Sequence, residues 1–159
     1  MKTFVDTAGR SWSIQLTIDS VKRVRGLLGV NLLDLVSGEP PLLTRFGTDI
    51  VLLCDVIFVL VKPQADAAEI TDEQFGIALG GEAILGAQSA FYDELISFFQ
   101  GLGRKDVIRA IAAQRNLIDK AVTRIALQLD QLDLDQMLEE TIGKMSTNLP
   151  GPAESTPAL

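Results

Sequence analysis

The side chains that most often perform acid–base and nucleophilic chemistry are nearly missing from this sequence. The chain contains no His, which is the commonest general base and a frequent metal ligand. Its single Cys, Cys54, lies in the apolar run from Ile50 to Val61 with no base beside it in the sequence. A free Cys in such a run usually packs as a small apolar residue. We therefore expect no catalytic residues and no enzymatic activity.

A cluster of carboxylates near the C-terminus is the best candidate for a metal site. It consists of Asp130, Asp133, Asp135, Glu139 and Glu140. A calcium-binding loop requires aspartates at alternate positions, a glycine at the turn and a final glutamate. This stretch lacks both the glycine and the spacing. We interpret the cluster as a solvated acidic face and expect no bound metal.

Two glycine clusters and one basic run are weak candidates for binding phosphate groups. The glycines lie at 76–81 and 101–103, and neither cluster follows a predicted strand or has the spacing of a nucleotide-binding loop. The basic run Lys22-Arg23-Val24-Arg25 contains no aromatic residue that could stack on a base. The net charge of −7 also opposes binding to a phosphate backbone. We expect no cofactor and no nucleic-acid partner.

Hydropathy favours a protein that does not enter a membrane. The longest apolar run, Ile50 to Val61, is interrupted by Asp55 and is shorter than the roughly 20 residues that span a bilayer. The first residues, Met1 to Asp6, contain no apolar core of signal-peptide length. One Cys cannot form an internal disulfide, which fits a reducing compartment. The sequence therefore predicts a cytoplasmic protein with no membrane partner.

The remaining patterns predict a mainly α fold, an α+β chain in which a helical bundle carries a small β element. Trp12, Ile14 and Leu16 alternate with polar residues and Gly9 supplies a turn, so residues 2–18 are predicted to form a β-hairpin. Helices are predicted at about 20–28, 49–61, 71–79, 83–100 and 105–145, forming a single domain over 1–146 with a long C-terminal helix. Residues 147–159, which are rich in proline, are predicted to form a disordered tail.

Capping residues set two of these helix starts. Asp19 or Ser20 is predicted to be the N-cap of the first helix. Thr71 and Gln74 have the spacing of a capping box, in which each side chain accepts a hydrogen bond from the other residue's backbone. These residues therefore place helix starts near positions 20 and 72.

Proline is predicted to end the most apolar helix. Residues 49–61 are apolar on nearly every side, which indicates a helix at the centre of the fold. The residue before a proline disfavours the helical conformation, so this helix is predicted to stop before Pro63 and a loop to cover 63–69. Residues 31–36 are predicted to add one or two helical turns before the stretch Gly38 to Pro41.

The last helix carries an apolar seam that is typical of a partner-binding surface. Apolar residues recur in an alternation of three and four over about three heptads, interrupted by Arg115. The predicted partner-binding residues are Ile111, Ile118, Val122, Ile125, Leu129 and Leu132. Such a seam indicates contact with another helix.

The charges along this helix are segregated. Residues 104–124 contain six basic and two acidic residues, and 128–146 contain five acidic and one basic residue. This order opposes the helix dipole. Two arrangements would relieve it: a second copy laid antiparallel, which makes a homo-oligomer, or a break near Leu129 to Leu134. In the second arrangement Asp133 is a new N-cap, Gln136 is at N3, and the acidic part folds back.

The order of elements resembles that of tail assembly chaperones and related small tail-module proteins of long-tailed bacteriophages and prophages. The matching segments follow the hairpin and are Ile18 to Leu33, the apolar stretch Asp55 to Lys62, the helix start Ala68 to Phe75, and Ala83 to Phe99. The resemblance covers roughly residues 2 to 100. It implies a non-enzymatic protein that coats the apolar tape-measure protein and keeps it soluble until tail-tube subunits assemble around it.

Three functional hypotheses follow. The first is a phage-type tail assembly chaperone in the bacterial cytoplasm, with the tape-measure protein or tail proteins as partners. The second is a structural component of a phage or prophage particle that self-assembles through its C-terminal helix. The third is an enzyme or small-ligand binder built around a cavity near Trp12 and Phe58.

Overall fold

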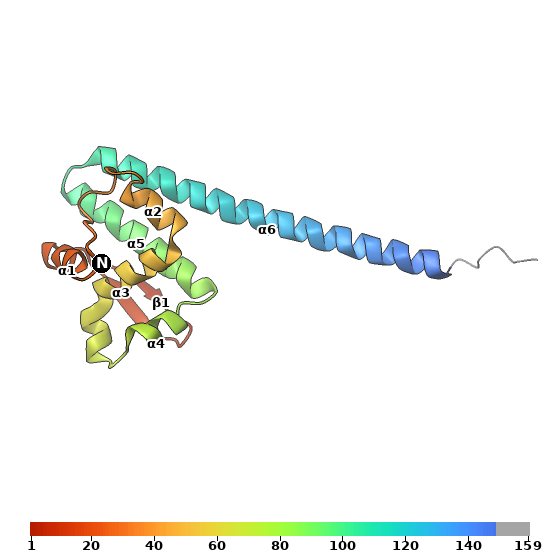
Figure 1. Ribbon diagram of the computed structural model, residues 1–159, viewed down its shortest axis with the longest axis horizontal. Helices are drawn as coiled ribbons and strands as arrows, with labels where there is room; N and C mark the ends of the chain where they lie inside the picture. Colours follow the sequence, from red (N-terminus) through yellow and green to blue (C-terminus); the bar gives the residue numbers. More distant parts are fainter. Residues whose placement is uncertain (149–159) are drawn as a thin grey trace, which may run out of the picture. The chain divides into compact units, whose positions relative to one another are not determined.

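The protein is described by a computed structural model that places residues 1–148, with side chains up to Lys144. The chain falls into two compact units, Met1–Ile118 and a second unit that begins at Asp119, and the single domain over 1–146 stays a prediction. The described elements are strands β1 (Lys2–Val5) and β2 (Ser11–Ile14) and helices α1 (Ile18–Leu28), α2 (Leu42–Thr48), α3 (Ile50–Ala67), α4 (Asp72–Ile77), α5 (Glu82–Gly101) and α6 (Lys105–Asn148), as Figure 1 shows.

The predicted fold class is confirmed. The described residues are mainly helical, the two strands form one antiparallel hairpin at the N-terminus, and the last helix is long. The tail was predicted to start at 147, whereas α6 continues to Asn148. The rest of the predicted tail, residues 149–159, lies outside the described residues.

The hairpin turn is held by the carboxylate of Asp6. Its Oδ1 accepts hydrogen bonds from the backbone nitrogens of Ala8 and Arg10, at 3.0 and 2.9 Å. Its Oδ2 accepts from Nε of Arg10 at 2.8 Å and from Nε1 of Trp12 at 2.9 Å. Gly9, with a φ of 79°, supplies the left-handed turn residue as predicted. Four donors thus converge on one buried side chain and fix the turn.

The start of α1 corrects the predicted cap. Thr17 is the N-cap, and its hydroxyl accepts from the backbone nitrogen of Ser20 at 3.1 Å. Ser20 is at N3 and accepts from the backbone nitrogen of Thr17 at 2.9 Å. Neither Asp19 nor Ser20 is the N-cap, although Ser20 takes part in the capping box as its N3 residue. The pair of Thr17 and Ser20 satisfies two free backbone amides, whereas Asp19 as N-cap would satisfy one. The capping box of Thr71 and Gln74 is confirmed.

The helix α3 does not stop before Pro63, and the predicted loop at 63–69 is wrong for most of its length. A proline inside a helix removes the amide that would donate to the carbonyl four residues earlier, here that of Val59. Arg23 of α1 replaces that donor: its Nη1 lies 2.9 Å from the Val59 oxygen and 3.4 Å from the Leu60 oxygen. This contact between helices allows α3 to run on to Ala67.

The extra turn of α3 brings Gln64 to the hairpin. The side-chain oxygen of Gln64 accepts from the backbone nitrogen of Ser13 at 2.9 Å, and its amide donates to the Ser13 oxygen at 2.7 Å. Gln64 therefore binds β2 as a neighbouring strand would. Because a two-stranded sheet is marginal by itself, these two bonds help to fix the hairpin on the helices.

The segment between α1 and α3 also differs from the prediction. Residues 31–36 form turns, not helix, although Leu32 and Leu35 are buried. The short helix α2 was not predicted. Its N-cap is Pro41, whose side chain makes no capping bond, so the start of the helix carries no capping signal. The backbone nitrogen of Leu43 donates a hydrogen bond to the Leu35 oxygen at 3.0 Å and so joins α2 to the turns at 31–36.

The core of the first unit lies around α3, as predicted for the most apolar helix. α3 contacts α1, α2, α4, α5 and β2, and α5 lies beside β1 (Figure 1). Phe75 of α4 packs against Trp12 and Phe58, with ring centroids 5.2 and 5.3 Å away. Phe46 and Phe91 join α2 to α5 at 5.3 Å. Aromatic contacts therefore join α4 to β2 and α3, and α2 to α5.

We expect Arg23→Met to lower the free energy of unfolding by about 1–3 kcal/mol, because the Val59 carbonyl loses the donor that replaces the Pro63 amide. Methionine keeps most of the apolar stem. Urea denaturation followed by circular dichroism measures the change, and Lys22→Met, on an exposed neighbour, is the control.

The same substitution in a Pro63→Ala background tests the cause. Alanine restores the backbone donor, so the cost of Arg23→Met should fall in that background. An equal cost with and without Pro63 would show that Arg23 stabilises the fold by another route.

Asp6 predicts an acid-dependent loss of stability. Burial acts to raise the pKa of this carboxyl, but hydrogen bonds from Trp12 and Arg10 outweigh it and lower the pKa below the ordinary 3.8. A carboxyl with a lowered pKa stabilises the fold above its unfolded pKa and loses that contribution as the pH falls through the folded pKa. The urea concentration at which half of the protein is unfolded should therefore decrease as the pH is lowered below about 4.

Asp6→Asn should be less stable near neutral pH and should show a shallower decline in acid. Asp130→Asn, an exposed carboxyl on α6, serves as the control and should follow the unmodified chain. Parallel pH profiles for Asp6→Asn and the unmodified chain would contradict this assignment.

Candidate protein-binding surface

The first turns of α6 belong to the core of the first unit. Val107 and Ile111 are buried, and the exposed fraction of Ile111 is 0%. Ile118 is partly buried and packs against the same core. The prediction that Ile111 binds a partner is therefore wrong, because its side chain already packs within its own chain. Its heptad spacing is the same as that of the exposed residues further along, so spacing alone did not separate them.

Polar contacts further fix this part of α6. The Nε2 atom of Gln114 donates to the Leu43 oxygen at 3.1 Å. A side chain at Gly47 would overlap this amide, so the Gln114 side chain reaches α2 where α2 has a glycine. Arg115, which interrupts the seam, forms an ion pair with Asp93 and donates to Oγ of Ser89 at 2.8 Å. The break in the seam is thus explained by a contact with α5.

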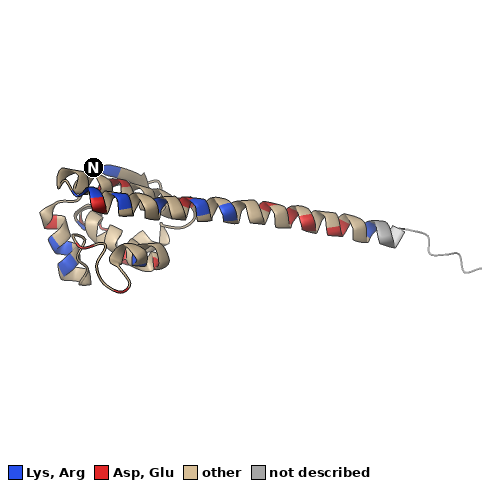
Figure 2. Ribbon diagram, turned by 90° about the horizontal axis from the view of Figure 1, so that it is seen from above, with Lys and Arg blue, Asp and Glu red and all other residues tan. Residues whose placement is uncertain are grey.

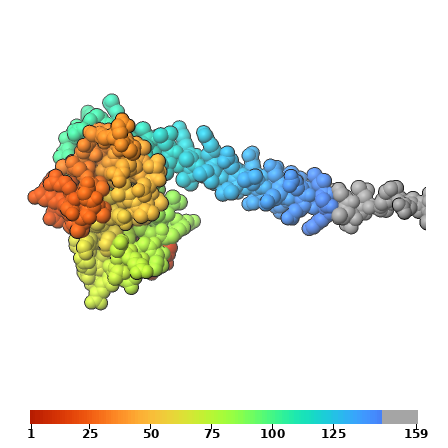
Figure 3. All heavy atoms as spheres, viewed as in Figure 1, coloured from red at the N-terminus to blue at the C-terminus, as the bar shows by residue number. Residues whose placement is uncertain are grey.

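In the second unit, every described side chain from Asp119 to Lys144 is exposed. Figure 3 shows one face of this stretch. Four of the predicted residues lie here, with exposed fractions of 44% for Val122, 56% for Ile125, 55% for Leu129 and 58% for Leu132. Their spacing of three and four places them on one face of the helix. We call these four residues the α6 stripe. They are the part of the predicted seam that is open to a partner.

The helix is continuous where a break was considered. Asp133 and Gln136 lie inside α6, so the alternative in which Asp133 starts a new helix and the acidic part folds back is wrong. No glycine or proline occurs between Gly103 and Gly143, so the chain lacks the residues that usually end a helix. The segregated charges therefore remain spread along one helix.

A second group of exposed apolar residues escaped the sequence analysis. Leu127, Leu134 and Leu138 are exposed by about 60% each and lie on the face opposite the α6 stripe. Their spacing of seven and four is a helical signal in the sequence, but it belongs to a different face from the predicted seam. The second unit therefore presents apolar side chains on two sides.

Charge changes sign along the exposed part of α6. After Asp119 come the basic residues Lys120 and Arg124, and the acidic residues from Asp130 to Glu140 follow. Figure 2 shows this order as blue ribbon followed by red along the helix. Arg104, the residue before α6, already has an acidic neighbour: its hydrogen bond to Asp106 lowers the pKa of that carboxyl to about 2. Arg115, in the basic half of α6, is also paired with Asp93 within the first unit, whereas the acidic half is exposed.

The other residues considered for chemistry, Cys54, Trp12 and Phe58, pack within the fold. Cys54 is half-buried, and burial, then the charge of Asp55, raises the pKa of its thiol, which is the opposite of activation. Trp12 is buried and bonded to Asp6, and Phe75 packs against both Trp12 and Phe58. Among the described residues, no group of three or more His, Cys, Asp or Glu side chains could hold a metal ion.

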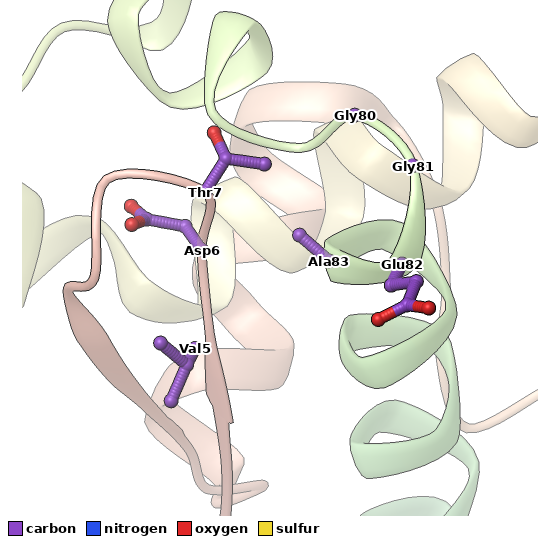
Figure 4. Close-up of a pocket in the computed structure, with 7 residues that line it drawn as sticks. All are labelled: Val5, Asp6, Thr7, Gly80, Gly81, Glu82 and Ala83. Carbon is purple, nitrogen blue, oxygen red and sulfur yellow. The ribbon is translucent and has the colours of Figure 1, made fainter.

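One depression in the first unit has a volume of about 680 Å³. It lies between the end of β1 and the Gly80–Gly81 turn that starts α5, as Figure 4 shows. The carboxylate of Asp6 lines it but is already occupied by four donors. The glycine cluster at 76–81 therefore forms the end of α4 and the start of α5.

Comparisons with protein-family models, curated proteins and solved structures found no match to this chain. Among the described residues, no helix is both long enough and apolar enough to cross a membrane.

Burial predicts a large loss of stability on substitution of one member of the predicted seam and almost none for another. Ile111→Ala should lower the free energy of unfolding by about 2–5 kcal/mol, because it leaves a cavity in the core. Leu129→Ala removes an exposed side chain and should change it by no more than about 0.5 kcal/mol. Urea denaturation of the two variants measures the difference. Equal losses would show that Leu129 is buried in solution.

Proposed function

We propose that this chain is a non-enzymatic protein that binds an apolar helical segment of another protein through the α6 stripe. The observation that carries this proposal is the exposure of the stripe. Between Asp119 and Lys144, all nine large apolar side chains are exposed by more than two-fifths. Exposed apolar surface of this extent on a solvated helix is typical of a protein contact site.

Binding of a helix is the contact that fits this surface best. The stripe repeats every three or four residues, so its side chains fit the grooves of a second helix. An extended peptide would need a sheet edge, but Gln64 binds the outer side of β2 and α5 packs against β1. A helical client is therefore the occupant that matches the geometry of the stripe.

We further propose that the chain acts as a phage-type tail assembly chaperone in the bacterial cytoplasm. The support is the resemblance in the order of elements, together with the exposed stripe. A tape-measure protein is long and helical and presents apolar stripes that aggregate if uncovered. A protein that covers such stripes one helix at a time keeps this client soluble until tail proteins replace it.

The second candidate function is a structural component of a particle that self-assembles through α6. The spacing of the stripe favours it, because in an antiparallel pair Val122 faces Leu132 and Ile125 faces Leu129. Detection of the protein in purified particles supports this function, whereas a chaperone should be missing from them.

Co-expression with the tape-measure protein of the same gene cluster tests the chaperone function. We expect the unmodified chain to keep the client in the soluble fraction and to co-purify with it. The double variant Ile125→Asp with Leu129→Asp should lose both effects, because charges replace the centre of the stripe.

The matched control is Thr123→Asp with Gln131→Asp, which adds the same charge on the other faces of α6 and should retain the client. Both double variants should unfold at the same urea concentration as the unmodified chain. Failure of the unmodified chain to bind the client, or retention by the stripe variant, would contradict the function.

A further inference from the structure

The residues beside the α6 stripe carry charge of one sign only. In heptad terms Val122 and Leu129 are at position a and Ile125 and Leu132 at position d, so the flanking positions e and g are fixed. The acidic flanking residues, here called the acidic margin, are Asp119, Asp133, Asp135 and Glu140, and all are exposed. The other flanking residues from 119 to 140 are Ala121, Ala126 and Gln128. None of the seven is basic.

The basic residues of this segment lie away from the stripe. Lys120 is at position f and Arg124 at position c, both on the outer side of the helix when a partner covers the stripe. The next two positions of the stripe beyond Leu132 are occupied by Gln136 and Glu139, so the apolar stripe ends in a polar and an acidic residue. Any helix in the stripe therefore meets carboxylates along its edges.

A second copy of this chain does not fit these edges. In the antiparallel pairing that matches the apolar residues, Asp119 of one copy lies opposite Asp133 of the other. In a parallel pairing, Asp135 lies opposite Glu140. Like charges at such positions destabilise a helix pair. Lys120 and Arg124 face outward in either pairing, so they do not compensate.

We propose that the occupant of the α6 stripe is a helix of another protein whose own apolar stripe is flanked by Lys or Arg residues. This inference rests on the proposed binding function and specifies the chemistry of its client. Basic flanks form ion pairs with the acidic margin from both edges, while the apolar residues interlock. The margin therefore selects among apolar helices that would otherwise bind alike.

Two synthetic peptides of about three heptads test the inference with the full chain. Both carry Leu and Ile at positions a and d, and they differ only in having Lys or Glu at all flanking positions. Each peptide repels itself equally, so neither has an advantage from self-pairing. Fluorescence anisotropy with labelled peptides gives the two dissociation constants.

At about 50 mM salt the Lys-flanked peptide should bind at least about tenfold more tightly than the Glu-flanked peptide. At about 1 M salt, where screening is strong, the ratio should fall below about threefold. Asp133→Lys, within the margin, should weaken binding of the Lys-flanked peptide about threefold. Asp130→Lys changes the net charge equally but lies outside the margin, and it should alter binding less than about twofold.

The outcomes separate the two proposals. Equal binding of both peptides would retain the stripe as a binding surface and overturn the selection by charge. Binding of neither peptide would overturn the stripe as a helix-binding surface and the inference with it. A dimer seen by sedimentation of the chain alone, lost in the double variant Ile125→Asp with Leu129→Asp, would identify a second copy as the occupant and overturn the inference.

Discussion

The hydrogen bond from the Arg23 guanidinium to the Val59 carbonyl is the contact on which the first unit depends. Pro63 removes the amide that would satisfy this carbonyl, and Arg23 supplies a donor from α1 in its place. Because α3 therefore continues beyond Pro63, Gln64 reaches the backbone of Ser13 and holds the hairpin against the helix. The hairpin in turn positions Trp12 against Phe75. This one hydrogen bond thus links α1 to the last turn of α3, and through that turn to a two-stranded sheet that is marginal by itself.

The elements that follow local rules could be predicted from the sequence, and those decided by distant residues could not. Alternation about Trp12 and the Thr71–Gln74 capping box gave the hairpin and the start of α4, because these signals lie within a few residues of each other. The stop at Pro63 was predicted wrongly because its replacement donor, Arg23, is far away in the sequence. Helix α2 was missed because Pro41 gives no capping signal and burial of Phe46 against Phe91 stabilises the helix.

The same limit explains how well the candidate surface was predicted. A heptad pattern identifies which residues share a face, so Val122, Ile125, Leu129 and Leu132 were grouped correctly on one side of α6. Whether that face is already covered depends on tertiary packing, and Ile111 is buried although its spacing is the same. The opposite face was not predicted for a simpler reason. Leu127 and Leu134 are also seven residues apart, but they do not belong to the three-four alternation that defines the predicted seam.

The energetics of the α6 stripe explain why charge would decide which helix binds in the proposed function. The four side chains are about half exposed, so covering them would contribute roughly 3–6 kcal/mol in all, about half of the 1.5–3 kcal/mol that full burial of each would give. Association of two molecules costs about 4–15 kcal/mol, so apolar contact alone leaves little net affinity. The acidic residues from Asp130 to Glu140 cost the helix little, because the dipole effect fades beyond the last turn and α6 continues to Asn148. The placement of Asp133, Asp135 and Glu140 beside the stripe would therefore add affinity for a basic helix and subtract it from an acidic one, which is the selectivity that the proposed client binding requires.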